Sequence, residues 1–239
     1  MQLIADPKQY EEKEKLYYEV RHKEGRIITD EVLKKLPYVD DSNPYYHEWK
    51  LRAQNLQRFL KYLEKFPAPR TKILDVGCGN GWMTHQLYDA GYDVTGADLN
   101  LEELQQAERA FGNNEKLQWL YADVLSNDIP DAPFDLVLFG ASCQYFPDID
   151  LLTKRLLPLL STGGEIHFLD SVFYQKGEDV RAANRSNEYY ASLGFPGMAA
   201  YYHHHTTDAL KKAGYTKVHP GLFSKATPLQ WWKYRNNKD

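Results

Sequence analysis

Three glycines at alternate positions follow an apolar run and are the residues of this chain that most clearly point to chemistry. Residues 73–76, Ile-Leu-Asp-Val, have the composition of a buried parallel strand, and Gly77, Gly79 and Gly81 come directly after it,. Glycine adopts backbone conformations that other residues avoid, and it lets the main chain approach a ligand closely. The pattern predicts a nucleotide-type binding loop between a strand and a helix.

The spacing of the loop distinguishes between classes of nucleotide. A dinucleotide-binding fingerprint would place its third glycine at position 82, where this chain has Trp82,. The loop is also preceded by an acid, Asp75, two residues before Gly77. Both features disfavour a nicotinamide-dependent oxidoreductase, which is retained as the less favoured alternative.

Two further acids end the next two predicted strands. Asp98 closes the segment 94–98 about 20 residues after Gly77, where a ribose would lie against the neighbouring strand and both of its hydroxyls could donate to the carboxylate,. Asp123 closes the segment 117–123 in the same way. Aspartate also favours turns and helix caps, so either acid alone could have that local role. The mutually consistent spacing of loop and acids indicates one binding site.

With these residues in view, the chain resembles the class I S-adenosylmethionine-dependent methyltransferases. Residues 75–81, Asp-Val-Gly-Cys-Gly-Asn-Gly, match the first motif of that family, and the resemblance continues to about residue 171. It implies S-adenosylmethionine as cofactor and S-adenosylhomocysteine as product, with the ribose at Asp98 and the adenine at Asp123. The cofactor-binding residues that it implies are Asp75, Gly77, Cys78, Gly79, Gly81, Asp98, Leu99, Asp123, Val124, Ala141 and Ser142.

The resemblance also implies the fold. We expect an α/β protein with a doubly wound, mostly parallel seven-stranded sheet of the Rossmann-like methyltransferase type. An antiparallel hairpin of residues 215–222 and 227–234 would complete the sheet at its carboxyl-terminal end. Residues 71–239 would form the methyltransferase domain, with an aromatic-rich insertion at 172–203 as a substrate cap.

Residues 1–70 are expected to form a helical cap or lid that packs on this core. Trp49, Ala53, Leu56, Leu60 and Leu63 recur at helical spacing in the longest of three predicted helices,. The predicted helices lie near residues 7–23, 30–36 and 44–66. Tyr17, Tyr18, Arg21, Tyr45 and Tyr46 are the lid residues that could reach a ligand, although packing alone also accounts for such tyrosines,.

Composition limits the partners. The formal net charge is −4 with interspersed signs, which disfavours a nucleic-acid acceptor,. There is no long apolar stretch and no apolar secretory core at the start of the chain, so we expect a soluble, cytoplasmic protein without a membrane partner,. The two cysteines, Cys78 and Cys143, exclude a disulfide framework and fit a reducing compartment,.

The catalytic candidates follow from the same logic. His203, His204 and His205 are adjacent, so they cannot easily converge on one metal ion, and no metal site is predicted,. One imidazole could instead act as a general base, and His204 is the residue named for this role, with Tyr145 on the acceptor side,. The hypothesis is methyl transfer to an oxygen or nitrogen of a small molecule. A catalytically silent methyltransferase-like binding subunit is the main alternative.

Overall fold

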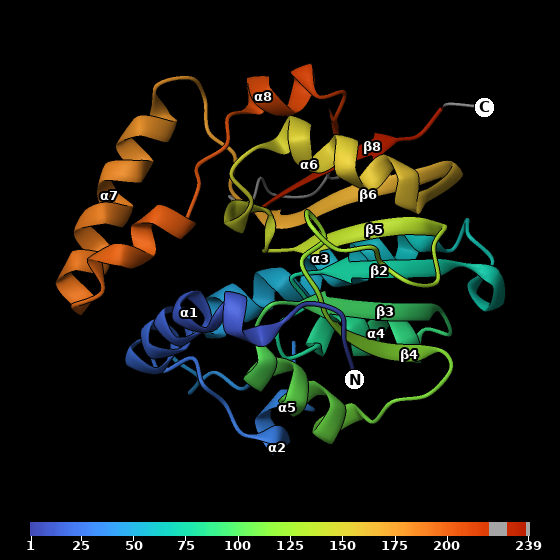
Figure 1. Ribbon diagram of the computed structural model, residues 1–239, viewed down its shortest axis with the longest axis horizontal. Helices are drawn as coiled ribbons and strands as arrows, with labels where there is room; N and C mark the ends of the chain where they lie inside the picture. The colour runs from blue at the N-terminus through green and yellow to red at the C-terminus, as the bar shows by residue number, and fades with distance from the viewer. Residues whose placement is uncertain (220–228, 238–239) are drawn as a thin grey trace.

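A mixed sheet forms the centre of the protein, flanked on both faces by helices (Figure 1). The computed structural model describes residues 1–219 and 229–237. In the described part the sheet has eight strands in the order β1-β4-β3-β2-β5-β6-β8-β7. The first six strands along the chain run parallel, whereas β8 is antiparallel to both β6 and β7. This arrangement confirms the expected doubly wound, mostly parallel fold.

The parallel strands β2 to β6 are largely buried, as expected for a sheet covered on both faces,. Their main-chain pairing places Val76 beside Ala97 and Asp98 beside Tyr121, so neighbouring strands end at the same edge. The strands are β1 (Gln2–Leu3), β2 (Lys72–Val76), β3 (Asp93–Asp98), β4 (Leu117–Tyr121), β5 (Phe134–Gly140), β6 (Leu160–Ser171), β7 (Thr216–Lys217) and β8 (Gln230–Arg235).

Strand β1 adds one strand to the seven that were expected. It consists of only two residues, Gln2 and Leu3, which pair with Leu120 and Tyr121. Two residues are too short for an alternating pattern to reveal, so the sequence carried no signal for this edge strand. Strands β7 and β8 supply the expected antiparallel pair, while residues 220–228, which include parts of both predicted segments, lie outside the described residues.

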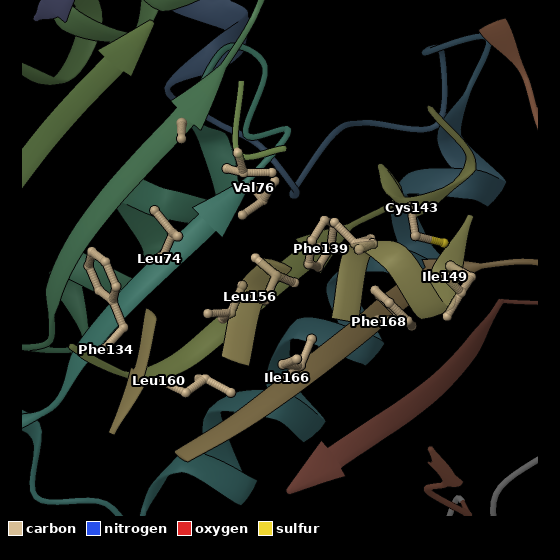
Figure 2. Packing of buried hydrophobic residues seen from close by; sticks show 14 of the residues in the cluster. Leu74, Val76, Phe134, Phe139, Cys143, Ile149, Leu156, Leu160, Ile166 and Phe168 are labelled. Carbon is tan, nitrogen blue, oxygen red and sulfur yellow. The ribbon is translucent and has the colours of Figure 1, made fainter. Parts of the chain in front are cut away.

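One face of the sheet packs against α6 and α8. Figure 2 shows Leu74, Val76, Phe139, Ile166 and Phe168 of the strands lying against the side chains of α6, in one contiguous buried cluster. The helices on this face are α6 (Ile149–Leu156) and α8 (Thr207–Lys212). Asp148 caps α6 by accepting the main-chain N–H groups of Asp150 and Leu151,.

The opposite face packs against α3, α4 and α5. Leu56, Phe59 and Leu63 of α3 form a second buried cluster with Leu87 of α4 and with Ile73 of the sheet. The predicted helical spacing of apolar residues in α3 is therefore its packing face. These helices are α3 (Tyr46–Leu63), α4 (Trp82–Asp89) and α5 (Leu101–Phe111).

Two segments outside the sheet lie together at one end of it, as Figure 1 shows for the blue α1 and the orange α7. Val20 of α1 forms a small buried cluster with Tyr190 of α7 and Met198 of η5. The elements concerned are α1 (Glu11–Lys23), α2 (Asp30–Leu33), α7 (Glu178–Leu193) and the 3₁₀ helix η5 (Pro196–Tyr201). Helix α1 and the insertion, with α7 and η5, thus form one joint cover. Across the described residues, no helix combines the length and the apolar character that crossing a membrane requires.

Candidate functional site

A cavity of about 760 Å³ lies at the carboxyl ends of the parallel strands, beneath α1 and η5. Open α/β sheets bind their ligands at this edge. The turns after β2, β3, β4 and β5 all contribute to its wall. The predicted cofactor-binding residues on the cavity are Gly77, Cys78, Gly79, Asp98, Leu99, Asp123, Val124, Ala141 and Ser142.

The glycine loop is held tightly between the turns after β3 and β5. The main-chain N–H of Gly77 donates to Ala97 O at 2.8 Å, and Ser142 Oγ donates to Val76 O at 2.5 Å. Gly77 has φ +68°, and a Cβ there would come within 2.5 Å of Ser142 Cβ. Only glycine allows the two turns to approach this closely. The same approach leaves the loop backbone facing the cavity.

Asp75 and Gly81 differ from the prediction, because neither lies on the cavity. The Asp75 carboxylate is buried beneath the loop and accepts a hydrogen bond from Thr84 Oγ1 at 2.7 Å, which fixes the first turn of α4. Burial raises the pKa of Asp75 to about 7. A Cβ on Gly81 would meet the Trp119 ring at 2.4 Å, so this glycine is required for packing of α4 on β4. Both residues therefore support the loop from the side that faces away from the cavity.

Asp98 links the loop to the next strand. Its Oδ2 accepts the main-chain N–H of Gly79 at 2.7 Å, and its Oδ1 accepts that of Asn100 at 2.8 Å. Each carboxylate oxygen has a second lone pair that these bonds leave unused. Burial raises the pKa of this carboxyl group. Asp98 can therefore hold the loop and still accept hydrogen bonds from a ligand in the cavity.

Asp123 stabilises a turn, the local role considered as the alternative to ligand binding, and it also lies on the cavity. Its Oδ1 accepts the main-chain N–H of Leu125 at 2.9 Å, and its Oδ2 accepts the hydroxyls of Tyr10 and Ser126 at 3.0 Å. The next main-chain N–H, that of Val124, has no hydrogen-bond partner among residues 1–219 and 229–237. An unpartnered N–H beside a carboxylate suits a heterocycle with adjacent acceptor and donor atoms, as in adenine.

Tyr145 stands on the cavity immediately after β5, in the 3₁₀ helix η3 (Cys143–Tyr145). Its hydroxyl accepts a hydrogen bond from Arg21 Nη2 at 2.9 Å, and its ring packs edge-on against Tyr17 and Tyr202. Of the lid residues named from the sequence, Tyr17, Arg21 and Tyr45 lie on the cavity, whereas Tyr18 and Tyr46 do not.

The three consecutive histidines have different environments, and the prediction of His204 as the general base is not supported by its position. His204 does not line the cavity, and its Nε2 is paired with Ser186 Oγ at 2.9 Å. His205 is buried, with Nε2 near Cys143 O at 3.3 Å. Only His203 lies on the cavity wall. The physical reason is that successive side chains of an extended segment point in opposite directions. Within the described ranges, no group of three or more His, Cys, Asp or Glu could hold a metal ion.

Glu103 is a residue of the cavity that sequence reasoning missed. It lies in the first turn of α5, and its Oε2 would be 3.0 Å from a Cβ on Gly79. Burial, with the nearby Asp98 carboxylate, raises its pKa to about 7. Acids are common in first helical turns, where they interact favourably with the helix dipole, so no sequence pattern singled out Glu103.

Comparisons with known proteins agree with this geometry. A sequence model for a methyltransferase domain matches residues 73–164. An uncharacterized methyltransferase of Mycobacterium tuberculosis is 33% identical over 94 residues, which are 39% of this chain and 47% of that protein. The malonyl-[acyl-carrier protein] O-methyltransferase of Pseudescherichia vulneris is 33% identical over 119 residues, 49% of this chain and 45% of that protein. The chain thus spans about half the length of these curated relatives.

A solved structure shows the same fold over most of the chain. The N-methyltransferase NodS from Bradyrhizobium japonicum, in complex with S-adenosylhomocysteine, superimposes with a TM-score of 0.57 at 16% identity. The match covers 87% of this chain and 98% of that one. At this identity the likeness concerns the fold alone.

Proposed function

We propose that this chain is a class I S-adenosylmethionine-dependent methyltransferase that transfers a methyl group to an oxygen or nitrogen atom of a small molecule. The observation that carries the proposal is a single cavity on which Gly77, Gly79, Asp98, Asp123 and Tyr145 all lie. Its volume, about 760 Å³, is in the range of small-molecule sites, roughly 300–1,000 Å³,.

The residues of the cavity fit an adenosyl sulfonium cofactor. We assign Asp98 to the ribose hydroxyls, because its two oxygens keep free lone pairs after binding Gly79 and Asn100. We assign Asp123 and the unpartnered N–H of Val124 to the adenine edge. The loop from Gly77 to Gly79, with Ala141 and Ser142, would accommodate the methionyl part.

S-adenosylmethionine supplies a methyl group that its positive sulfur already activates. The protein must therefore mainly align an acceptor lone pair behind the methyl carbon and exclude water. Holding both reactants in line can contribute roughly 7–11 kcal/mol to lowering the barrier. Tyr145 follows β5 at the position expected for the acceptor, and α1 with η5 covers the cavity above it. No covalent bond to the protein is required.

Isothermal titration with S-adenosylhomocysteine tests this proposal. We expect saturable binding to one site, and a parallel thermal-shift measurement with NADH should show no stabilisation. Stabilisation by NADH instead would favour the oxidoreductase alternative. Methyl transfer from labelled S-adenosylmethionine to any acceptor in a metabolite extract would separate an active enzyme from a catalytically silent binding subunit. Absence of binding at millimolar S-adenosylhomocysteine would exclude the proposed function.

A further inference from the structure

The cavity presents one imidazole, that of His203, with both ring nitrogens available. Among residues 1–219 and 229–237, no side chain or carbonyl is within hydrogen-bond distance of either nitrogen, whereas His204 and His205 are each engaged by a protein oxygen. The main chain of His203 is fixed, because its N–H donates to Gln144 O at 2.7 Å. This bond joins the main chain of His203 to the turn after β5, and both His203 and Tyr145 line the cavity.

Lys13 lines the same cavity as this imidazole, with Nζ 5.6 Å from the ring centroid of Tyr201. Its ammonium forms no ion pair in the part of the chain that the structure describes, although its charge also acts on the Asp98 carboxylate. Burial lowers the pKa of His203, and the charge of Lys13 lowers it further. The neighbouring His204 and His205 are the other titratable groups of that segment, and burial lowers the pKa of each.

A neutral imidazole and an ammonium group that line one cavity are suited to an acceptor that becomes negatively charged when it loses a proton. The imidazole can take a proton, and the ammonium can stabilise the negative oxygen that remains. A phenolic hydroxyl has a pKa of about 10, within reach of such a pair. An aliphatic hydroxyl, which is about as weak an acid as water at roughly 16, is much further from it. Carboxylic acids are already ionised at neutral pH and need no base.

The walls around His203 are also suited to an aromatic ring. Tyr201, Tyr145, Tyr17 and Phe146 line the cavity, and Met198 lies among them. Aromatic side chains favour edge-to-face or offset contacts with a bound ring. The aromatic insertion therefore contributes to the acceptor end of the cavity as well as to the packing of α1.

We infer that the acceptor is a phenol and that His203 removes its hydroxyl proton while Lys13 stabilises the developing oxyanion. This inference rests on the proposed methyltransferase function. The phenolic proton moves to a ring nitrogen of His203, and an oxygen lone pair forms the bond to the methyl carbon. The electron pair of the carbon–sulfur bond stays with sulfur. The products are an aryl methyl ether, S-adenosylhomocysteine and an imidazolium that returns its proton to water.

Binding of 4-nitrophenol to the protein saturated with S-adenosylhomocysteine tests the inference without turnover. The yellow phenolate absorbs differently from the phenol, so the spectrum reports the protonation state of the bound probe. At a pH where the free probe is mostly protonated, we expect the wild-type protein to bind it largely as phenolate. His203→Gln should lose most of the phenolate signal, because the bound phenolate then lacks the imidazolium charge that stabilises it.

The matched control is His204→Gln, which changes the adjacent residue off the cavity and should leave the signal unchanged. Lys13→Gln provides a second variant on a different element, and we expect it to lower the bound phenolate fraction about tenfold. A phenolate signal that persists in either His203→Gln or Lys13→Gln would overturn the inference, as would a wild-type complex that does not bind the probe. If S-adenosylhomocysteine itself does not bind, the titration described above reports that separate failure of the proposed function.

Discussion

Arg21 Nη2 donates a hydrogen bond to the hydroxyl of Tyr145 at 2.9 Å, which joins α1 of the cover to the turn after β5. The same guanidinium donates to Glu24 Oε2 at 3.0 Å and lies over the Tyr17 ring, 4.9 Å from its centroid. Hydrogen bonds that involve a charged group contribute about 1.5–3 kcal/mol. The contact therefore ties the position of the cover to the residue that faces the acceptor.

Replacement of Arg21 by glutamine should loosen α1. We expect the amide hydrogens of residues 11–23 to exchange about tenfold faster, because loss of roughly 1.4 kcal/mol of local stabilisation changes an opening equilibrium by that factor. Hydrogen exchange with mass spectrometry measures this directly. Arg181→Gln, which removes an exposed pair on α7 at 3.8 Å from Glu178, is the control and should leave α1 unaffected. Equal protection of α1 in wild type and Arg21→Gln would show that the Arg21–Tyr145 hydrogen bond does not hold α1 in place.

Asp98 accepts main-chain N–H groups in the folded protein and is assigned to the ribose hydroxyls of the cofactor. Replacement by asparagine distinguishes these two roles. Asp98→Asn keeps one oxygen to accept an N–H from the loop but removes the charge and one acceptor,. We expect S-adenosylhomocysteine to bind about 10- to 100-fold more weakly, which corresponds to about 1.5–3 kcal/mol. Calorimetric titration gives the affinity, and denaturant unfolding should show a smaller loss of stability. Unchanged affinity would refute the assignment of Asp98 to the ribose.

The strands that carry the glycine loop and the two acids could be predicted because local pattern and physical role agree there. A short apolar run that ends in glycine or aspartate is visible in the sequence, and the parallel order then brings Gly77, Asp98 and Asp123 to one edge. The spacing of apolar residues likewise identified the packing face of α3. Each of these features depends on residues close together in the chain.

The remaining features depend on contacts between distant segments, which spacing does not encode. Gly81 is a glycine because Trp119 packs against it, although in the sequence it looks like a third ligand-binding glycine. Which of the three consecutive histidines faces the cavity depends on distant residues. Gln144 O accepts the main-chain N–H of His203, and Ser186 Oγ is paired with the His204 ring. The sequence therefore predicts that a histidine is near the site, but it does not predict which imidazole faces the cavity.

Gly81 and Gly194 allow the packing requirement to be measured. Both have positive φ, +75° and +91°, but a Cβ on Gly81 would meet the Trp119 ring at 2.4 Å, whereas nothing lies within 4 Å of one on Gly194. Gly194→Ala should destabilise the protein by about 1 kcal/mol, the usual conformational cost. We expect Gly81→Ala to add an overpacking cost of about 1–3 kcal/mol. Urea unfolding compares the unfolding free energies of the two variants. Similar losses for both would show that the Trp119 ring moves aside at little cost.

Asp75 should make the unfolding free energy depend on pH, and the Asp75→Asn variant should lack this dependence. Burial raises the pKa of its carboxyl in the folded protein to about 7, above the value of about 3.9 for an unfolded aspartate,. The folded state therefore holds a proton that the unfolded state has released between these values. The contribution of Asp75 is fully present below pH 4 and is lost as the pH rises through 7.

Asp75→Asn keeps an oxygen to accept the hydrogen bond from Thr84 Oγ1 but cannot ionise,. From pH 4.5 to 6.5 we expect the unfolding free energy of the wild type to fall relative to this variant, by on the order of 1 kcal/mol per pH unit. Denaturant unfolding of both proteins at several pH values isolates this difference, because all other titrating groups are shared. Parallel pH profiles would mean that Asp75 is already ionised in the folded protein across this range, with the Thr84 hydroxyl sufficient to stabilise its charge.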